Sequence, residues 1–306
     1  MRIVITGGCG FIGSNLTEEL SGDNEVVILD NLATGSVDNI KGLDVEFVEG
    51  DVTDLDLLQD MFQSVDYVLH QAAVVSVPES IKDPLKTNEV NARGTLNVLL
   101  AARDNGVRKV VNASSCAVYG DTDELPISED VTPNPKSPYA VTKLTAEYYC
   151  NVFTELYGLG TVSLRYFNVY GPRQDPQSDY AAAIPKFITK VLKGGSPVIF
   201  GDGEQTRDFV YVKDVVKANI MAMEGEESGI FNVATGRKVS VNELASLIIE
   251  LSGNDLSPVY DEPREGDIMH SYGDASRIKE AMGFEASYGI EEGLRETMGW
   301  FKEWNW

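Results

Sequence analysis

The stretch Thr6–Gly13, with the sequence TGGCGFIG, decides the fold. It follows a short apolar run and precedes an amphipathic segment, so it lies where a strand passes into a helix. Glycine is needed where such a turn takes positive φ and where backbone must approach a phosphate closely. Gly7, Gly10 and Gly13 therefore predict a loop whose following helix points its N-terminus at a dinucleotide pyrophosphate.

An acidic residue, Asp30, ends the second apolar run. A carboxylate at this position accepts hydrogen bonds from both hydroxyl groups of an adenosine ribose and repels a 2′-phosphate. The residues that follow, Asn31–Gly35, contain no Arg or Lys. The sequence therefore predicts NAD rather than NADP as the cofactor.

Short apolar segments alternate with amphipathic segments through the first half of the chain, which is typical of a parallel sheet covered on both faces. Strands are expected at Arg2–Thr6, Glu25–Leu29, Val45–Val48, Tyr67–His70, Lys109–Ala113 and Thr161–Arg165. Helices are expected near Phe11–Leu20, Leu55–Phe62, Asn88–Asn105 and Pro138–Tyr157.

Beyond Tyr166 this alternation loosens, and glycine- and proline-rich loops separate the remaining segments. Helices are expected near 183–192, 213–223, 241–251 and 290–304, with a strand at 230–233 returning to the sheet. The pattern predicts an α/β protein, a Rossmann-type doubly wound parallel sheet with a smaller α/β C-terminal substrate lobe. We expect residues 1–167 and about 210–236 to form the NAD-binding domain, and about 168–209 and 237–306 to form the lobe.

The composition excludes several classes of partner. The 306 residues carry 48 Asp and Glu against 25 Lys and Arg, a net charge of −23 that would repel nucleic acid and anionic lipid. A strand begins at residue 2 and no apolar run approaches bilayer length, so we expect a cytoplasmic protein without a signal peptide or membrane contact. Three cysteines without a CxxC, and two histidines without ligand spacing, predict neither a disulfide framework nor a metal site.

Tyr139 and Lys143 stand four positions apart in a predicted helix, so their side chains share one face. An ammonium group stabilises phenolate, and with the positive ring of the cofactor it should lower the tyrosine pKa from about 10 toward neutrality. Such a tyrosine can take a proton from an alcohol while a hydride leaves the same carbon. Tyr139 and Lys143 are therefore candidate catalytic residues.

The YxxxK spacing is common by itself and gains specificity from Ser114 and Ser115, at the end of the fifth expected strand. That strand end lies at the carboxyl edge of the sheet, where the cofactor is expected. Ser115 is thus the candidate partner of the reacting oxygen. We interpret Ser114 as a residue that caps the following loop.

Together these features resemble the extended short-chain dehydrogenase/reductase family, and its UDP-sugar 4-epimerase branch in particular. The resemblance runs nearly from end to end. It also rests on Asp30–Leu32 (DNL), Ser76–Ser80 (SVPES), Leu164–Gln174 (LRYFNVYGPRQ), Gly201–Gly203 (GDG), Arg207–Phe209 (RDF) and Arg264–Asp267 (REGD).

The resemblance implies two sets of binding residues. Besides the glycine loop and Asp30, those lining NAD would be Phe11, Ile12, Asn31, Thr34, Gly35, Asp51, Val52, Gln71, Ala72, Ala73, Asn91, Tyr139, Lys143 and Phe167. Asp51 and Val52 fit equally well as the cap between a strand and a helix. Those around a UDP-sugar substrate would be Ser76, Ser115, Asn168, Ala183, Val198, Phe200, Arg207, Arg264, Asp267 and Ser271, although Val198 and Phe200 could simply pack a core.

The reaction implied by the resemblance is epimerisation at C4 of a UDP-hexose. Hydride passes from C4 to NAD, giving a transient 4-keto sugar, and returns to the opposite face after the sugar turns about its diphosphate linkage. Asn168, Arg207 and Arg264 would hold the diphosphate, since a bidentate guanidinium suits phosphate and offsets the adverse net charge. Dehydratases and decarboxylases of this type carry acidic residues after the serine, whereas this chain has Cys116 and Ala117.

The choice of sugar depends on Ser271. Galactose-specific members carry a bulky Tyr three residues before an Asp, here Asp274, and the smaller serine would leave room for an N-acetyl group. We therefore expect UDP-GlcNAc and UDP-GalNAc as substrates, with UDP-Glc and UDP-Gal accepted too. An exposed turn residue is the alternative interpretation of Ser271, and Cys116 stands where the N-acetylhexosamine epimerases often have Ser.

Two other functions remain open at the level of sequence. One is a 4-epimerase of UDP-glucuronate or another nucleotide sugar, and the other is a non-catalytic regulator that senses a dinucleotide. Such regulators usually lack the Tyr or the Lys, and both are present here. The resemblance also implies a homodimer, formed through the helices around Asn88–Asn105 and Pro138–Tyr157.

Overall fold

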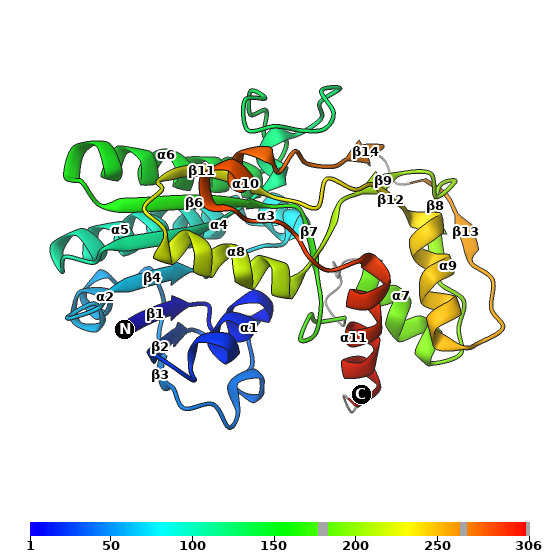
Figure 1. The fold of residues 1–306 in the computed structure, drawn as a ribbon, viewed down its shortest axis with the longest axis horizontal. Coiled ribbons are helices and arrows are strands. Elements are labelled where there is room, and N and C mark those ends of the chain that lie inside the picture. The colour runs from blue at the N-terminus through cyan, green and yellow to red at the C-terminus, as the bar shows by residue number, and fades with distance from the viewer. Residues whose placement is uncertain (177–182, 264–267, 304–306) are drawn as a thin grey trace.

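A computed structural model describes residues 1–176, 183–263 and 268–303, and its core is one seven-stranded parallel sheet (Figure 1). The strand order is β11-β6-β5-β4-β1-β2-β3, which is the doubly wound order of a Rossmann fold extended by one strand. This confirms the predicted fold class. The strands are β1 (Arg2–Thr6), β2 (Glu25–Asp30), β3 (Glu46–Glu49), β4 (Tyr67–His70), β5 (Lys109–Ser115), β6 (Gly160–Tyr166) and β11 (Gly229–Val233).

Helices cover both faces of this sheet because successive residues of each strand point to opposite sides. Ile3 and Ile5 of β1 belong to the core under α1 (Phe11–Leu20) and α8 (Val212–Glu224). Val4 between them belongs to the opposite core, under α2 (Leu55–Met61), α5 (Gly94–Asp104) and α6 (Pro138–Tyr157). Two-sided burial explains why the strands read as continuous apolar runs rather than alternating ones.

The helix expected near Asn88–Asn105 is present, but it starts at Pro84 and a π-helical turn interrupts it. It consists of α4 (Pro84–Asn88), a π-helical turn η2 (Glu89–Arg93) and α5. A short helix, α3 (Val77–Lys82), precedes them and was not predicted. Its start was nevertheless readable, because Ser76 accepts a hydrogen bond from the Glu79 amide and a proline follows in the first turn.

The smaller lobe has a separate core to which Phe187, Ile248 and Phe301 contribute, each from a different helix. Its helices are α7 (Ala183–Leu192), α9 (Val241–Ser252) and α11 (Ile290–Glu303). The short strands outside the central sheet are β7 (Asn168–Tyr170), β8 (Val198–Phe200), β9 (Thr206–Arg207), β10 (Phe209–Tyr211), β12 (Val239–Ser240), β13 (Val259–Asp261) and β14 (His270–Ser271). The remaining elements of the chain are α10 (Ser276–Met282) and two 3₁₀ turns that follow strands of the central sheet, η1 (Val37–Ile40) and η3 (Cys116–Tyr119).

A buried ion pair ties α6 to the sheet. Arg165 of β6 donates from Nε and Nη2 to the two carboxylate oxygens of Glu147 on α6, at 2.9 and 2.7 Å. The side chains are only 3% and 0% exposed, and the guanidinium also lies 4.6 Å from the centre of the Tyr119 ring. Breaking such a pair leaves a buried charge without compensation, which costs about 3–5 kcal/mol. The position of α6 is therefore strongly constrained.

None of the helices in the described ranges is long and apolar enough to cross a membrane. Within the same ranges, no group of three or more His, Cys, Asp or Glu residues is arranged to hold a metal ion.

Candidate nucleotide and catalytic site

The glycine loop joins β1 to α1 through very close backbone contacts. Gly7 has φ +70°, and a Cβ there would lie 2.8 Å from the amide nitrogen of Ala72. A Cβ on Gly13 would fall 2.0 Å from the carbonyl oxygen of Gly7, which no side chain can tolerate. Gly10 donates its amide hydrogen to that same oxygen at 3.1 Å. Gly7 and Gly13 thus meet requirements of this turn that only glycine satisfies, and a Cβ on Gly10 would make a tight contact of 3.2 Å with the Gly7 oxygen.

The N-terminus of α1 is left open by this loop. Gly10 is the N-cap, none of the described side chains caps the helix, and its first turn contains no acidic residue. Backbone N–H groups at an uncapped helix start, together with the helix dipole, form an anion site. Phe11 and Ile12, predicted to line the cofactor, begin this helix.

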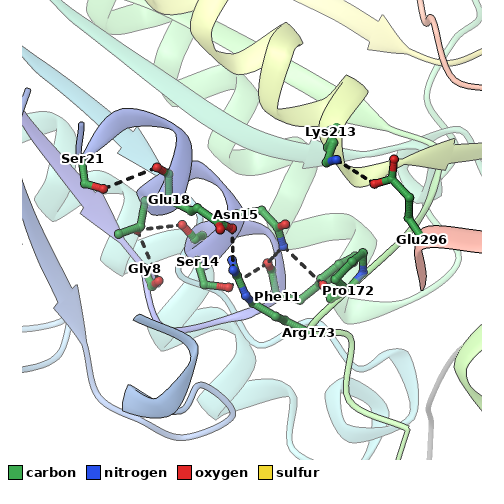
Figure 2. A network of polar contacts seen from close by, with 12 residues as sticks. Gly8, Phe11, Ser14, Asn15, Glu18, Ser21, Pro172, Arg173, Lys213 and Glu296 are labelled. Carbon is green, nitrogen blue, oxygen red and sulfur yellow. Dashed lines mark hydrogen bonds and ion pairs between the residues drawn. The ribbon is translucent and has the colours of Figure 1, made fainter. Parts of the chain in front are cut away.

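Contacts with the loop that follows β7 hold α1 in place, as Figure 2 shows. Asn15 donates from Nδ2 to the carbonyl oxygens of Phe11 and Pro172, at 2.9 and 3.3 Å. Arg173, a non-glycine residue with φ +69°, forms an ion pair with Glu18 at 2.5 Å. These contacts fix the anion site relative to the loop after β7.

Asp30 closes the other side of the glycine loop. Its Oδ2 accepts a hydrogen bond from the Cys9 amide at 2.9 Å, and its Oδ1 accepts one from the Leu32 amide at 2.8 Å. The carboxylate is 7% exposed, and each oxygen has a further lone pair for a ribose hydroxyl. Gly35 also packs on this loop, since a Cβ there would lie 2.8 Å from the carbonyl carbon of Cys9.

Asn31 and Asp51, predicted for the same region, meet across the ends of β2 and β3. Asn31 donates from Nδ2 to Oδ2 of Asp51 at 2.7 Å, and Asp51 also accepts from the amide of Thr53. Asp54, rather than Asp51, caps α2. Val52 is buried, and a Cβ on Gly94 would lie 2.6 Å from its Cγ2, so its side chain packs in the core.

The segment after β4 passes directly against the glycine loop. The Ala72 amide donates to Oγ1 of Thr6 at 3.3 Å, and Gln71 donates from Nε2 to Asn219 at 3.1 Å. Asn91, from the π-helical turn η2, donates to the Val74 carbonyl at 3.0 Å and accepts from the Val74 amide at 2.8 Å. The side-chain amide of Asn91 therefore holds Val74, and with it the segment that contains Ala72 and Ala73. Ala73 is half-buried in this segment, whereas Thr34 is exposed in the loop after β2.

A directed chain of hydrogen bonds supports the same region from within the core. Thr95 donates to the Asn91 carbonyl at 2.6 Å, so its oxygen accepts from Nε2 of His70 at 2.9 Å. Nδ1 of His70 then accepts from Thr6 at 2.7 Å. Burial, aided by the nearby charge of Lys143, lowers the pKa of His70 to about 3, so the ring stays neutral. Sequence reasoning missed this supporting role, for which the chain carries no local signal.

Ser115, Tyr139 and Lys143 meet at the carboxyl edge of the sheet. Ser115 ends β5 and accepts a hydrogen bond from the Ala117 amide at 3.2 Å, while Tyr139 and Lys143 lie in the first two turns of α6. The Lys143 ammonium donates to the Ala113 carbonyl at 2.7 Å and lies 6.0 Å from the centre of the Tyr139 ring. The three predicted catalytic residues thus share one site.

The expected lowering of the tyrosine pKa includes the effect of the positive cofactor ring, so it stays a prediction for the NAD-bound protein. Burial raises the pKa of Tyr139 to about 12, although a hydrogen bond with Ser115 acts in the opposite direction. Burial also lowers the pKa of Lys143 to about 8, against the attraction of Glu147. In the chain alone, desolvation therefore has the largest effect on the pKa of both groups.

Glu147 is a residue of this site that sequence reasoning missed, although it follows Lys143 by one helical turn. Besides Arg165 it accepts a hydrogen bond from Ser114 Oγ at 2.5 Å. Ser114 is therefore a buried strand residue, and its interpretation as a loop cap is wrong. The spacing of four residues after Lys143 was the available signal.

Arg207 and Ser271 lie opposite each other in the smaller lobe, because β9 pairs with β14 in a register that aligns them. Ser271 is 9% exposed and in a strand, so the alternative of an exposed turn residue is wrong. Asn168 approaches the same strands and donates from Nδ2 to the Asp208 carbonyl at 3.3 Å. Phe167, one residue earlier, is buried.

The remaining predicted substrate residues are distributed around this lobe. Val198 and Phe200 lie at the two ends of β8, and Ala183 begins α7. A cavity of about 710 Å³ opens beside Phe200, lined also by Gln205, Tyr260, Pro263 and Met269. Ser76 caps α3. Arg264 and Asp267 lie outside the described residues.

Comparison with known proteins identifies the family. The sequence profile of the NAD dependent epimerase/dehydratase family matches residues 3–234. A putative UDP-glucose 4-epimerase of Methanocaldococcus jannaschii is 44% identical, with 99% of each chain covered.

Two solved structures are also similar over nearly the whole chain. One is a UDP-N-acetylglucosamine 4-epimerase of Methanobrevibacter ruminantium in complex with UDP-N-acetylmuramic acid (TM-score 0.96, 43% identity, 99% and 98% coverage). The other is a UDP-glucose 4-epimerase of Thermus thermophilus in complex with NAD (TM-score 0.90, 39% identity, 99% of each chain).

This chain therefore belongs to the NAD dependent epimerase/dehydratase family, as its resemblance to the extended short-chain dehydrogenases predicted. NAD is the cofactor of that family, and the residues present fit it. The uncapped start of α1 suits the pyrophosphate, and the buried carboxylate of Asp30 suits the ribose.

The contact between Gly13 and Gly7 gives a direct test of the glycine loop. We expect Gly13→Ala to destabilise the fold by about 2 kcal/mol, because its Cβ forces the loop apart. It should also lower the NAD retained by the purified protein at least about tenfold, since the amides at the start of α1 move with the loop. Unfolding curves and the NAD released on denaturation measure both effects.

Gly22→Ala is the matched control, because Gly22 has open space around its Cβ position. We expect this variant to stay within about 0.5 kcal/mol of the wild type and to keep its NAD. A Gly13→Ala protein that retained the full amount of NAD would contradict the account of the loop.

Proposed function

We propose that this chain is a UDP-sugar 4-epimerase that interconverts UDP-GlcNAc and UDP-GalNAc and also accepts UDP-Glc and UDP-Gal. The observation that carries the proposal is the meeting of Ser115, Tyr139 and Lys143 at the edge of a sheet whose glycine loop fits NAD. Bound NAD supplies the acceptor, and then the donor, of the C4 hydride.

Three residues of the chain take part in the proposed proton transfer. The Tyr139 phenol exchanges a proton with the C4 oxygen, and Ser115 binds the same oxygen through a hydrogen bond. Lys143 has a pKa of about 8 and is mostly cationic at neutral pH, so its charge favours phenolate. Because burial raises the tyrosine pKa, the positive ring of bound NAD would add to the charge of Lys143 in favouring phenolate.

Water elimination is disfavoured by the residues that follow Ser115. Burial raises the pKa of the Cys116 thiol to about 12, with the nearby charge of Asp208 adding to the effect. A thiol with this pKa is a poor general acid, and Ala117 has no ionisable group. The chain thus lacks at this point the acid that dehydratases and decarboxylases of this type carry.

We propose that the smaller lobe holds the UDP portion of the substrate, and that residues 1–167 and about 210–236 hold NAD. Asn168, Arg207 and Arg264 would bind the diphosphate, and Asp267 the uridine ribose. Val198, Phe200 and Ala183 would enclose the base, beside the cavity next to Phe200. A firm hold on the diphosphate leaves the sugar free to present either face.

The N-acetyl preference is supported by the environment of Ser271. Its buried, paired position opposite Arg207 puts it beside the proposed diphosphate clamp rather than in solvent. A small side chain there leaves space for a substituent at C2, whereas a tyrosine would fill that space.

Substituting this residue tests the sugar preference. We expect the wild type to interconvert UDP-GlcNAc and UDP-GalNAc, and Ser271→Tyr to lose at least about tenfold in kcat/KM for these sugars. Activity on UDP-Glc should persist, because that sugar lacks the bulky substituent. Chromatography of the products from UDP-GlcNAc, UDP-Glc and UDP-glucuronate makes the measurement.

A Ser271→Tyr protein with unchanged N-acetyl activity would remove the argument for this pocket. A wild type that acted on UDP-glucuronate alone would replace the proposed substrate with its carboxylated relative.

We propose further that the protein is a homodimer. An apolar surface runs over α3, α4 and α6, which pack on one another, and Ile81, Leu85, Tyr148 and Leu156 are each more than half exposed on it. Exposed apolar patches of this kind mark interaction sites, and a second copy of the chain can bury them symmetrically. The exposed residues come from α3, α4 and α6, whereas α5, which is fully described, contributes no exposed large hydrophobic residue.

Light scattering measures this assembly directly. We expect a mass twice that of the chain, and Leu85→Glu combined with Leu156→Glu should shift the protein toward monomer by placing charge in the apolar surface. A wild type that remained monomeric at high micromolar concentration would contradict the proposal.

A further inference from the structure

The Asp208 side chain is fully buried where four segments of the chain meet. It follows Arg207 at the junction of β9 and β10 and contacts the loop after β11, the loop after β14 and the start of β7. In the function proposed above, this carboxylate neither contacts the substrate nor transfers a proton. A buried carboxylate is nonetheless costly unless hydrogen bonds stabilise it, so its partners show what it does.

Four donors converge on the two carboxylate oxygens. Oδ1 accepts from the amide and the hydroxyl of Thr235, at 2.9 and 2.6 Å. Oδ2 accepts from the amides of Gly236 and Gly273, at 3.0 and 3.2 Å. Three of these donors are backbone N–H groups, so the carboxylate fixes the course of the main chain in two separate loops.

The main chain of Asp208 completes the set of contacts. Its amide donates to the Ser271 carbonyl at 2.9 Å, and its carbonyl accepts from the Asn168 amide at 3.0 Å. Through these bonds one residue joins the segments of Arg207, Asn168 and Ser271. All three are residues that we propose to contact the UDP-sugar.

Close packing at Gly273 makes this arrangement specific. A Cβ there would lie 2.6 Å from Cε2 of Phe167 and 2.7 Å from Cβ of Ala234, so only glycine lets its amide reach Asp208. The loop that leads away from Ser271 is thereby held against Phe167, which belongs to the proposed cofactor site. The carboxylate thus links the two halves of the proposed active site.

We propose that Asp208 is a positioning residue that sets Arg207 and Ser271 in register, so that the diphosphate clamp and the sugar pocket form one rigid unit. This inference rests on the proposed function. A carboxylate is needed because all four of its partners donate, whereas an asparagine of the same shape presents an NH₂ group to two of them. With an asparagine at this position, the loops around its side chain would have to separate.

The substitution Asp208→Asn tests this, with Asp214→Asn as the matched control. Asp214 is also fully buried, and it accepts from the Ser287 amide and hydroxyl, both at 2.9 Å, and from the Tyr288 amide at 3.1 Å. Its partners lie in the loop between α10 and α11 and include none of the proposed substrate residues. Both variants therefore lose a buried carboxylate, and only one of them is in the proposed site.

We expect Asp208→Asn to raise both the KM for UDP-GlcNAc and the Kd for UDP by about tenfold or more, with kcat changed less than about threefold. Most of the NAD should be retained, because the glycine loop and Asp30 are untouched and only the loop beside Phe167 is affected. Both variants should lower the Tm by similar amounts, because each loses a buried carboxylate. Asp214→Asn should nevertheless leave KM and Kd within about twofold of the wild-type values. Calorimetric titration with UDP and steady-state kinetics make these measurements.

The outcomes separate this inference from the proposed function. If the wild type interconverts UDP-sugars but Asp208→Asn changes only the Tm, or Asp214→Asn raises KM equally, the positioning role is refuted and the function stands. If the wild type neither binds UDP nor acts on UDP-sugars, both fail.

If Asp208→Asn does not fold, Thr235→Val provides a second test of the same inference. This variant removes the hydroxyl donor at 2.6 Å and leaves the Thr235 amide in place. We expect a rise in KM of about threefold, and an unchanged KM together with a lowered Tm would refute the inference.

Discussion

The site depends on one close contact between backbone segments, the approach of Gly13 to the carbonyl oxygen of Gly7. No side chain fits there, because a Cβ would lie 2.0 Å from that oxygen. The contact draws α1 against the end of β1, and Gly7 in turn lies against Ala72 at the end of β4. The anion site at the start of α1 and the edge of the sheet are therefore fixed together. Further contacts stabilise this unit from outside. Asp30 accepts a hydrogen bond from the Cys9 amide of the glycine loop, and the contacts of Asn15 and Arg173 join α1 to the loop after β7.

Burial and charge oppose each other at the catalytic residues. The same desolvation that excludes water raises the pKa of Tyr139 to about 12 and lowers that of Lys143 to about 8. Glu147 moderates the second effect, but its charge is shared with Arg165. Tyr139 is consequently protonated in the chain alone, and a cationic cofactor beside it would favour its phenolate form. This coupling suits an enzyme whose cofactor stays bound through each turnover.

The sequence predicted those features that have a local signal. The parallel strands, the glycine loop, Asp30 and the Tyr139–Lys143 pair follow from apolar runs, turn chemistry and helical spacing. The two- and three-residue strands of the smaller lobe have no periodicity, because distant pairing alone creates them, as when β14 aligns Ser271 with Arg207. The roles of His70 and Asp208 were missed for the same reason, since their partners are remote in sequence.

The most direct test of the account is to incubate the purified protein with UDP-GlcNAc, without added NAD, and to resolve the products. We predict conversion to UDP-GalNAc until a fixed ratio of the two sugars is reached, because retained NAD is regenerated in each turnover. Tyr139→Phe should keep its NAD but lose at least about 100-fold in rate, since the proton acceptor is gone. An oxidised sugar that accumulates only when NAD is added, or an unimpaired Tyr139→Phe protein, would contradict the account.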